Sequence, residues 1–177
     1  MCSSDLYKAA AEIGELGDNV RALRASIVAD DLLRRALSSP TARVTVLGHT
    51  RWASVGIISE PNCHPVNGEQ LESGGAEQQQ YTLAVLNGDV DNHADLKVDH
   101  GLRIAGPITT DAKVIPALMA QFAAAGVDTA EAFRRTVTEF EGSVAIAAQS
   151  ADRPDEVYLA LRGSGQGLYV EIGRAHV

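Results

Sequence analysis

Residues 81–93 read YTLAVLNGDVDNH and contain the sharpest change of pattern in the chain. The first six residues are mostly apolar and end at Leu86, which predicts a strand. Residues 92–97 then predict a short, capped helical turn. The Asn87-Gly88 pair between them has two interpretations. It is the strongest short signal for a hairpin turn, and at a strand end it could offer a side-chain amide and a backbone N–H to a negatively charged oxygen.

The chain after this stretch alternates between helical and extended patterns. Thr109-Thr110-Asp111 predicts a helix start, and an apolar stripe from Val114 to Phe122 follows it. Pro116 removes one helical hydrogen-bond donor, so this helix should be kinked or begin late. Residues 129–140 predict another helix. Three strands are predicted, at residues 143–148, 157–161 and 167–170.

The chain before this stretch also contains both patterns. Residues 43–49 (RVTVLGH) alternate and predict a strand. Residues 7–39 have helical spacing, Asp30-Asp31 should cap a second short helix, and we expect this region to pack on a sheet. The polar residues 68–80 predict a surface excursion. Strands and helices in separate runs indicate an α+β fold with helices stacked on a sheet.

Composition narrows the class of protein. The 177 residues suffice for one domain with a core, and 45% of them are apolar. No apolar run approaches the ~18 residues of a membrane helix, and no signal peptide opens the chain. The net charge of -8 argues against nucleic-acid binding. Two cysteines fit a reducing compartment and form no metal pattern. We therefore expect a cytoplasmic protein without metal or cofactor.

The two ends of the chain can be encoded by complementary DNA. Residues 1–6 can be written GTG TGC TCT TCC GAT CTC, and its reverse complement, GAG ATC GGA AGA GCA CAC, encodes residues 171–176. This string resembles a common short-read sequencing adapter. We therefore expect residues 1–6 and 171–177 to be translated adapter, with the domain in residues 7–170. We also expect the gene to continue beyond both ends.

Two charged side chains could recognise a free amino acid. Arg51 offers a planar fork that can hold a carboxylate by two parallel hydrogen bonds, and Asp111 could accept hydrogen bonds from an ammonium group. Trp52 could form a wall of the same pocket. The alternatives are a surface ion pair for Arg51 and simple complementation of a helix N-terminus for Asp111.

Two histidines and a cysteine also invite functional interpretations. His49 and His64 favour structural roles, because neither has a second metal ligand at a useful spacing. Cys63 and His64 are adjacent, and adjacent residues of an extended segment point to opposite faces. A cysteine–histidine catalytic pair is therefore not expected there.

The order of several blocks resembles the glutaminase domain of the glucosamine-6-phosphate synthase family, also named glutamine–fructose-6-phosphate aminotransferase. The blocks correspond to the family's HTRWAT, N-x-HP, HNG-x-x-x-NH, T-D, L-x-G-[AS] and ARSGSP segments. They extend over residues 9–170 and read GHTRWAS (48–54), EPNCHP (60–65), LNGDVDNH (86–93), Thr110-Asp111, EGS (141–143) and LRGSG (161–165).

The resemblance implies a four-layer αββα sandwich of the N-terminal nucleophile type, here incomplete. It implies that glutamine is hydrolysed through a cysteinyl thioester and that ammonia passes to a sugar-isomerising domain, in a homodimer when full length. Asn87 and Gly88 would form the oxyanion hole, and Arg51 and Asp111 would hold the two ends of glutamine. Trp52 would close the site. Possible support would come from Thr50, Ser54 and His64.

The chain departs from the family at several places. Val55 and Leu86 stand where histidine is frequent, and Pro107-Ile108 stands where an acidic residue is usual. The opening Met-Cys-Gly-Ile with the nucleophile is missing, and Ser3 after Cys2 does not match it. The chain as written is therefore predicted to be inactive. The alternatives are another type 2 amidotransferase, similar to amidophosphoribosyltransferase, and a non-catalytic glutamine-binding or scaffold module.

Overall fold

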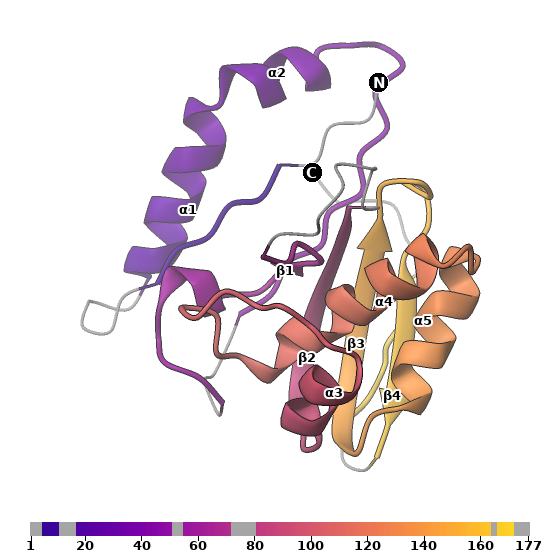
Figure 1. Cartoon of the computed structure of the whole chain (residues 1–177). Helices are drawn as coiled ribbons and strands as arrows, with labels where there is room; N and C mark the ends of the chain where they lie inside the picture. Colours follow the sequence, from indigo (N-terminus) through magenta and orange to yellow (C-terminus); the bar gives the residue numbers. More distant parts are fainter. Residues whose placement is uncertain (1–4, 11–16, 51–54, 72–80, 164–165, 172–177) are drawn as a thin grey trace.

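The computed structural model describes residues 5–10, 17–50, 55–71, 81–163 and 166–171. These residues form a mixed fold of helices and one antiparallel sheet, which confirms the predicted α+β class (Figure 1). In chain order the elements are α1 (Asp18–Ala29), α2 (Asp31–Leu37), η1 (Glu60–Asn62), β1 (Val66–Asn67), β2 (Thr82–Val90), α3 (His93–Asp99), η2 (Asp111–Lys113), α4 (Val114–Ala124), α5 (Thr129–Thr138), β3 (Gly142–Ser150) and β4 (Tyr158–Arg162).

The sheet has the strand order β1-β2-β3-β4, and each neighbouring pair is antiparallel. β2 and β3 pair along nine residues each, from Thr82 opposite Ser150 to Val90 opposite Gly142. β1 is short and pairs with β2 only as far as Ala84. The strands predicted for residues 81–86, 143–148 and 157–161 are confirmed, and the rest of the outer edge of β2 lies beyond β1.

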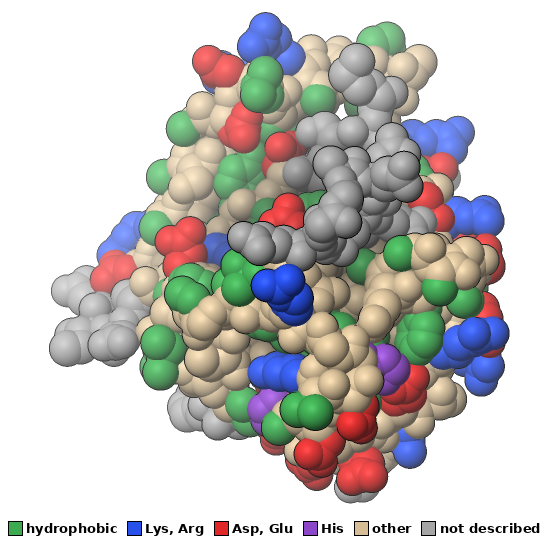
Figure 2. Space-filling model, in the orientation of Figure 1, with side chains coloured by type: hydrophobic (Ala, Val, Ile, Leu, Met, Phe, Trp, Pro, Cys, Tyr) green, Lys and Arg blue, Asp and Glu red, His purple; other side chains and the backbone are tan. Residues whose placement is uncertain are grey.

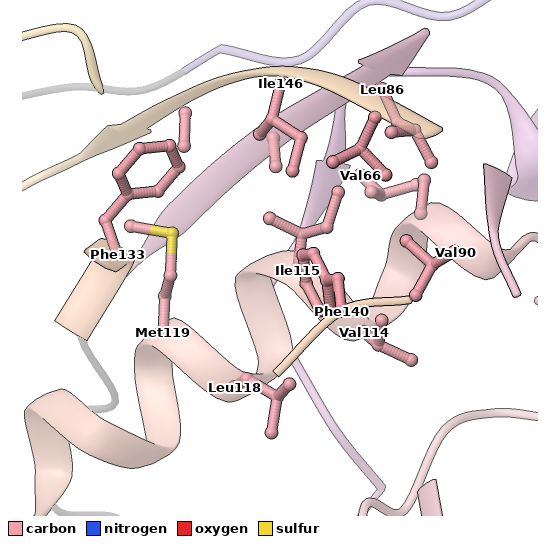
Figure 3. Packing of buried hydrophobic residues seen from close by; sticks show 14 of the residues in the cluster. Val66, Leu86, Val90, Val114, Ile115, Leu118, Met119, Phe133, Phe140 and Ile146 are labelled. Carbon is pink, nitrogen blue, oxygen red and sulfur yellow. The ribbon is translucent and has the colours of Figure 1, made fainter. Parts of the chain in front are cut away.

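The hydrophobic core lies between β2 and β3 and the helices α4 and α5 (Figure 3). Side chains alternate along a strand, so every second residue of β2 and β3 points toward the helices. α4 supplies Ile115 and Leu118, both fully buried. The predicted late start of this helix is confirmed, because α4 begins at Val114 and Pro116 lies in its first turn, where a missing N–H costs no helical bond.

The opposite face of the sheet is also apolar. Ala145 and Ala147 of β3 lie there, paired with Leu161 and Leu159 of β4. These two leucines remain 45% and 43% exposed, respectively. The sheet therefore has one face buried under helices and one apolar face that stays partly open.

Two predicted strands are wrong. Residues 43–49 run without strand pairing, and Val46 on this segment is 82% exposed. This segment contacts the loop between β3 and β4 at Thr45, whose hydroxyl donates to Pro154 O at 2.9 Å. Residues 167–170 are also irregular and exposed. An alternating sequence predicts a strand only if a partner edge is available, and in the described ranges neither segment has one.

The N-terminal helical region forms as predicted but packs differently. Asp30 caps α2, because its Oδ1 accepts hydrogen bonds from Leu32 N and Leu33 N at 2.9 Å each. Neither α1 nor α2 has a buried residue, and Figure 1 shows both set apart from the sheet. The expectation that this region packs on a sheet is therefore wrong for residues 18–37.

Acidic side chains gather at the end of the molecule that carries α3 (Figure 2). Asp91, Asp95 and Asp99 are exposed on this helix and on the turn before it.

None of the helices in the described ranges is long and apolar enough to span a membrane.

Lys113 gives the fold a testable pH dependence. Its side chain is 1% exposed, and Nζ donates to the backbone oxygen and Oδ1 of Asn67 at 2.6 and 2.9 Å. Burial lowers its pKa to about 8. In the unfolded chain lysine keeps its proton up to a pKa of about 10.4, so between pH 8 and 10 the unfolded state binds more protons and stability rises with pH.

We expect Lys113→Met to remove this rise. Relative to the variant, the wild type should gain on the order of 1–3 kcal/mol of unfolding free energy between pH 7 and pH 10. Urea unfolding at pH 7, 8, 9 and 10 measures the difference. Parallel stability curves for the two proteins would show that the Lys113 amine keeps an ordinary pKa.

Candidate functional site

Asn87 and Gly88 lie inside β2 and not in a turn. They pair with Ala145 and Val144 of β3, which rules out the hairpin interpretation. Gly88 has φ 116°, a conformation that favours glycine. A Cβ built on Gly88 would lie 1.9 Å from Ser143 O, so the backbones of β2 and β3 approach closely there. Asn87 is exposed on the strand face opposite the core.

The outer edge of β2 beyond β1 is held by side chains. Leu86 N–H donates to His64 Nδ1 at 3.3 Å, and Val90 N–H donates to Asp111 Oδ2 at 2.8 Å. In an antiparallel strand, residues two apart direct their N–H groups to the same edge. The N–H of Gly88 therefore belongs to the edge that His64 and Asp111 occupy.

Thr110 connects these two side chains. His64 Nε2 lies 3.5 Å from Thr110 Oγ1, and that hydroxyl donates to Asp111 Oδ1 at 3.4 Å. Both Asp111 and His64 are buried, at 3% and 8% exposure. The Asp111 carboxylate thus accepts hydrogen bonds at both oxygens, and one of them comes from Val90, two residues after Gly88 on β2. Asp111 also attracts the Lys97 ammonium, which opposes the lowering of that lysine's pKa by burial.

Asn62 positions this segment and was not predicted as a site residue. It is fully buried, and its Oδ1 accepts from Thr109 N and Thr110 N at 2.7 and 3.0 Å. Its Nδ2 donates to Ser59 Oγ at 2.9 Å. The side chain therefore joins the segment before His64 to the segment before Asp111, two blocks that sequence order alone had associated.

The predicted site residues Arg51, Trp52 and Ser54 lie outside the described residues. Thr50 is exposed and irregular in conformation. The ring of His49 packs on that of His64, with 4.7 Å between centroids and 35° between planes. The chain therefore passes beside the His64–Asp111 group at His49.

Cys63 takes no part in this group. Cys63 Sγ contacts Ala9 O at 3.5 Å, whereas the neighbouring His64 contacts Leu86 and Thr110. The expected divergence of these two side chains is thus confirmed. Cys2 lies outside the described residues. No three His, Cys, Asp or Glu side chains converge as a metal site in the described part of the chain.

Three proteins to which the chain is similar share the name glutamine–fructose-6-phosphate aminotransferase (isomerizing). The one from Geobacillus kaustophilus (strain HTA426) is 37% identical over 143 residues, 77% of this chain and 22% of the relative. The one from Shouchella clausii (strain KSM-K16) is 32% identical over 127 residues, 72% of this chain and 20% of the relative. The one from Staphylococcus aureus (strain Mu50) is 34% identical over 130 residues, 70% and 20%. The chain thus spans about a fifth of the length of these relatives. No protein-family model matches it.

Proposed function

Because the chain is related to one domain-sized part of glutamine–fructose-6-phosphate aminotransferase, we propose that it is the glutaminase domain of such an enzyme. In this proposal the domain hydrolyses glutamine to glutamate, and the ammonia serves glucosamine 6-phosphate synthesis in a sugar-isomerase domain that follows. The names of the three relatives favour this assignment over an amidophosphoribosyltransferase.

The observation that carries the proposal is the edge of β2. Asn87 and Gly88 lie on a strand with a left-handed glycine, and the Asp111 carboxylate holds the N–H two residues further along. A buried negative charge suits an ammonium group and N–H donors suit an oxyanion, so this combination at one strand edge supports the proposal. Removing one such oxyanion donor typically costs about 3 kcal/mol of barrier.

The chemistry assigns each residue a separate task. Asp111 would hold the α-amine of glutamine, and Arg51 its carboxylate. The amine of an N-terminal cysteine would take the proton of its own thiol, and the thiolate would attack the side-chain amide carbon of glutamine. Asn87 with the Gly88 N–H would stabilise the negative oxygen, and the amine would return the proton to the amide nitrogen, which leaves as ammonia. Water would then hydrolyse the thioester to glutamate and free the thiol. His64 would keep the donor edge in place, with Thr50, Ser54 and Trp52 near the pocket.

The open sheet face supports the finer fold assignment. In an αββα sandwich a second sheet packs on the sheet face that the helices leave free. Leu159 and Leu161 make that face of β4 apolar and leave it partly exposed. We propose that a second sheet, which includes the family's opening strand, covers it in the full gene product.

The nucleophile provides the test. We expect no ammonia release from L-glutamine by the 177-residue chain, and steady release by a full gene product that begins Met-Cys-Gly. Coupled detection of ammonia and glutamate measures both. Release by the 177-residue chain that disappears in Cys2→Ala would contradict the assignment of the nucleophile. A full gene product that binds glutamine without turnover would instead support a non-catalytic module.

A further inference from the structure

Gln166, four residues after the end of β4, lies beside the candidate oxyanion site. Gln166 Nε2 lies 3.2 Å from the position that a Cβ on Gly88 would occupy. Gly163, which follows β4 directly, is also close-packed, because its own Cβ position lies 2.8 Å from Ser143 Cα. The carboxamide of Gln166 therefore lies against Gly88, although the two residues belong to distant parts of the sequence.

One atom of this carboxamide has an unmet bonding capacity. Gln166 Oε1 is buried and has no hydrogen-bond partner among the residues that the structure describes. A buried carbonyl oxygen without a donor is disfavoured, and such groups in native proteins call for a specific explanation. A ligand that brings an N–H donor to this place would satisfy it.

We propose that Gln166 is a specificity residue that accepts a hydrogen bond from the side-chain amide of the substrate glutamine. This inference rests on the proposed function, which places the substrate's amide carbon beside Gly88. A primary amide carries two N–H donors, whereas the carboxylate of glutamate carries none. Gln166 Oε1 thus accepts a hydrogen bond from the amide of glutamine. With glutamate the same oxygen meets a negatively charged carboxylate oxygen and is repelled, so the site favours glutamine over glutamate.

Two substitutions separate this role from packing alone. Gln166→Met keeps the length of the side chain and removes the acceptor. Gln166→Glu keeps an acceptor oxygen and adds a negative charge. Gln121→Met is the matched control, because Gln121 is exposed on α4 and donates to His100 O, remote from Gly88.

The experiment measures KM for glutamine and the inhibition constant of glutamate in the full gene product. Gln166→Met should raise KM by about 5- to 30-fold and leave glutamate inhibition within about twofold. Gln166→Glu should keep KM within about threefold and weaken glutamate inhibition by about tenfold or more. Gln121→Met should change neither constant, and melting temperatures verify folding.

Each outcome decides between the two proposals. Gln166→Met could leave the ratio of KM for glutamine to the inhibition constant of glutamate unchanged. Gln166 would then only pack against Gly88, and the inference would be overturned. If the wild-type full gene product does not turn over glutamine, the proposed function fails first and the specificity role fails with it.

Discussion

Replacing Gly88 by alanine is expected to destabilise the fold by about 2–5 kcal/mol. Left-handed backbone costs a residue with a Cβ about 1–2 kcal/mol, and overpacking a tight site costs a further ~1–3 kcal/mol. Both terms apply here, because φ is 116° and the new methyl group would lie 1.9 Å from Ser143 O. The obstacle is backbone, so no side-chain rotation relieves it. β2 and β3 would have to separate at the centre of the sheet.

Gly126 provides the control for the strain term alone. It also has a left-handed φ of 83°, but a Cβ there meets nothing within 4 Å. Gly126→Ala should therefore cost only about 1–2 kcal/mol. Urea unfolding of the three proteins at pH 7.5 measures the difference. Equal costs for the two variants would show that β2 and β3 do not approach as closely at Gly88 as described.

The sequence predicted the central layers of the fold well, because local pattern and tertiary role agree there. β2, β3 and α4 each bury an apolar face, and the spacing of its apolar residues in the sequence is the one that a strand or a helix requires. The strand predictions for residues 43–49 and 167–170 were wrong for one shared reason. Alternation describes how a strand would present its side chains, whereas strand formation also requires a partner, and periodicity contains no information about a partner.

The candidate site was predictable only in its outline. The order of blocks associated Asn87 with Asp111, and the structure brings Asp111 to the edge of the same strand. Asn62 and Gln166 were missed, because each acts on residues far away in sequence. Their type is ordinary for a loop, and no local spacing distinguishes a buried bridging amide from an exposed one. Only the folded structure shows which of these amides is buried.

The second large effect concerns Asp111, whose carboxylate has a structural role at the edge of β2 and a proposed role in binding glutamine. Asp111→Ala removes the acceptor for Val90 N–H and the partner of the Thr110 hydroxyl, both at a buried position. Leaving a buried donor unsatisfied costs about 1–3 kcal/mol, so we expect a loss of about 2–4 kcal/mol in unfolding free energy. Urea unfolding of the chain measures it.

Asp111→Asn separates the two tasks. Its amide keeps one oxygen to accept from Val90 N–H and an N–H₂ group to donate to Thr110 Oγ1, so stability should fall by less than about 1.5 kcal/mol. The negative charge is lost, and with it the proposed pairing to a substrate ammonium, typically worth about 2–5 kcal/mol for a buried pair. KM for glutamine in the full gene product should therefore rise by roughly 30-fold or more. If Asp111→Asn binds glutamine as tightly as the wild type, the carboxylate serves only the edge of β2, and the amine of the substrate is held elsewhere.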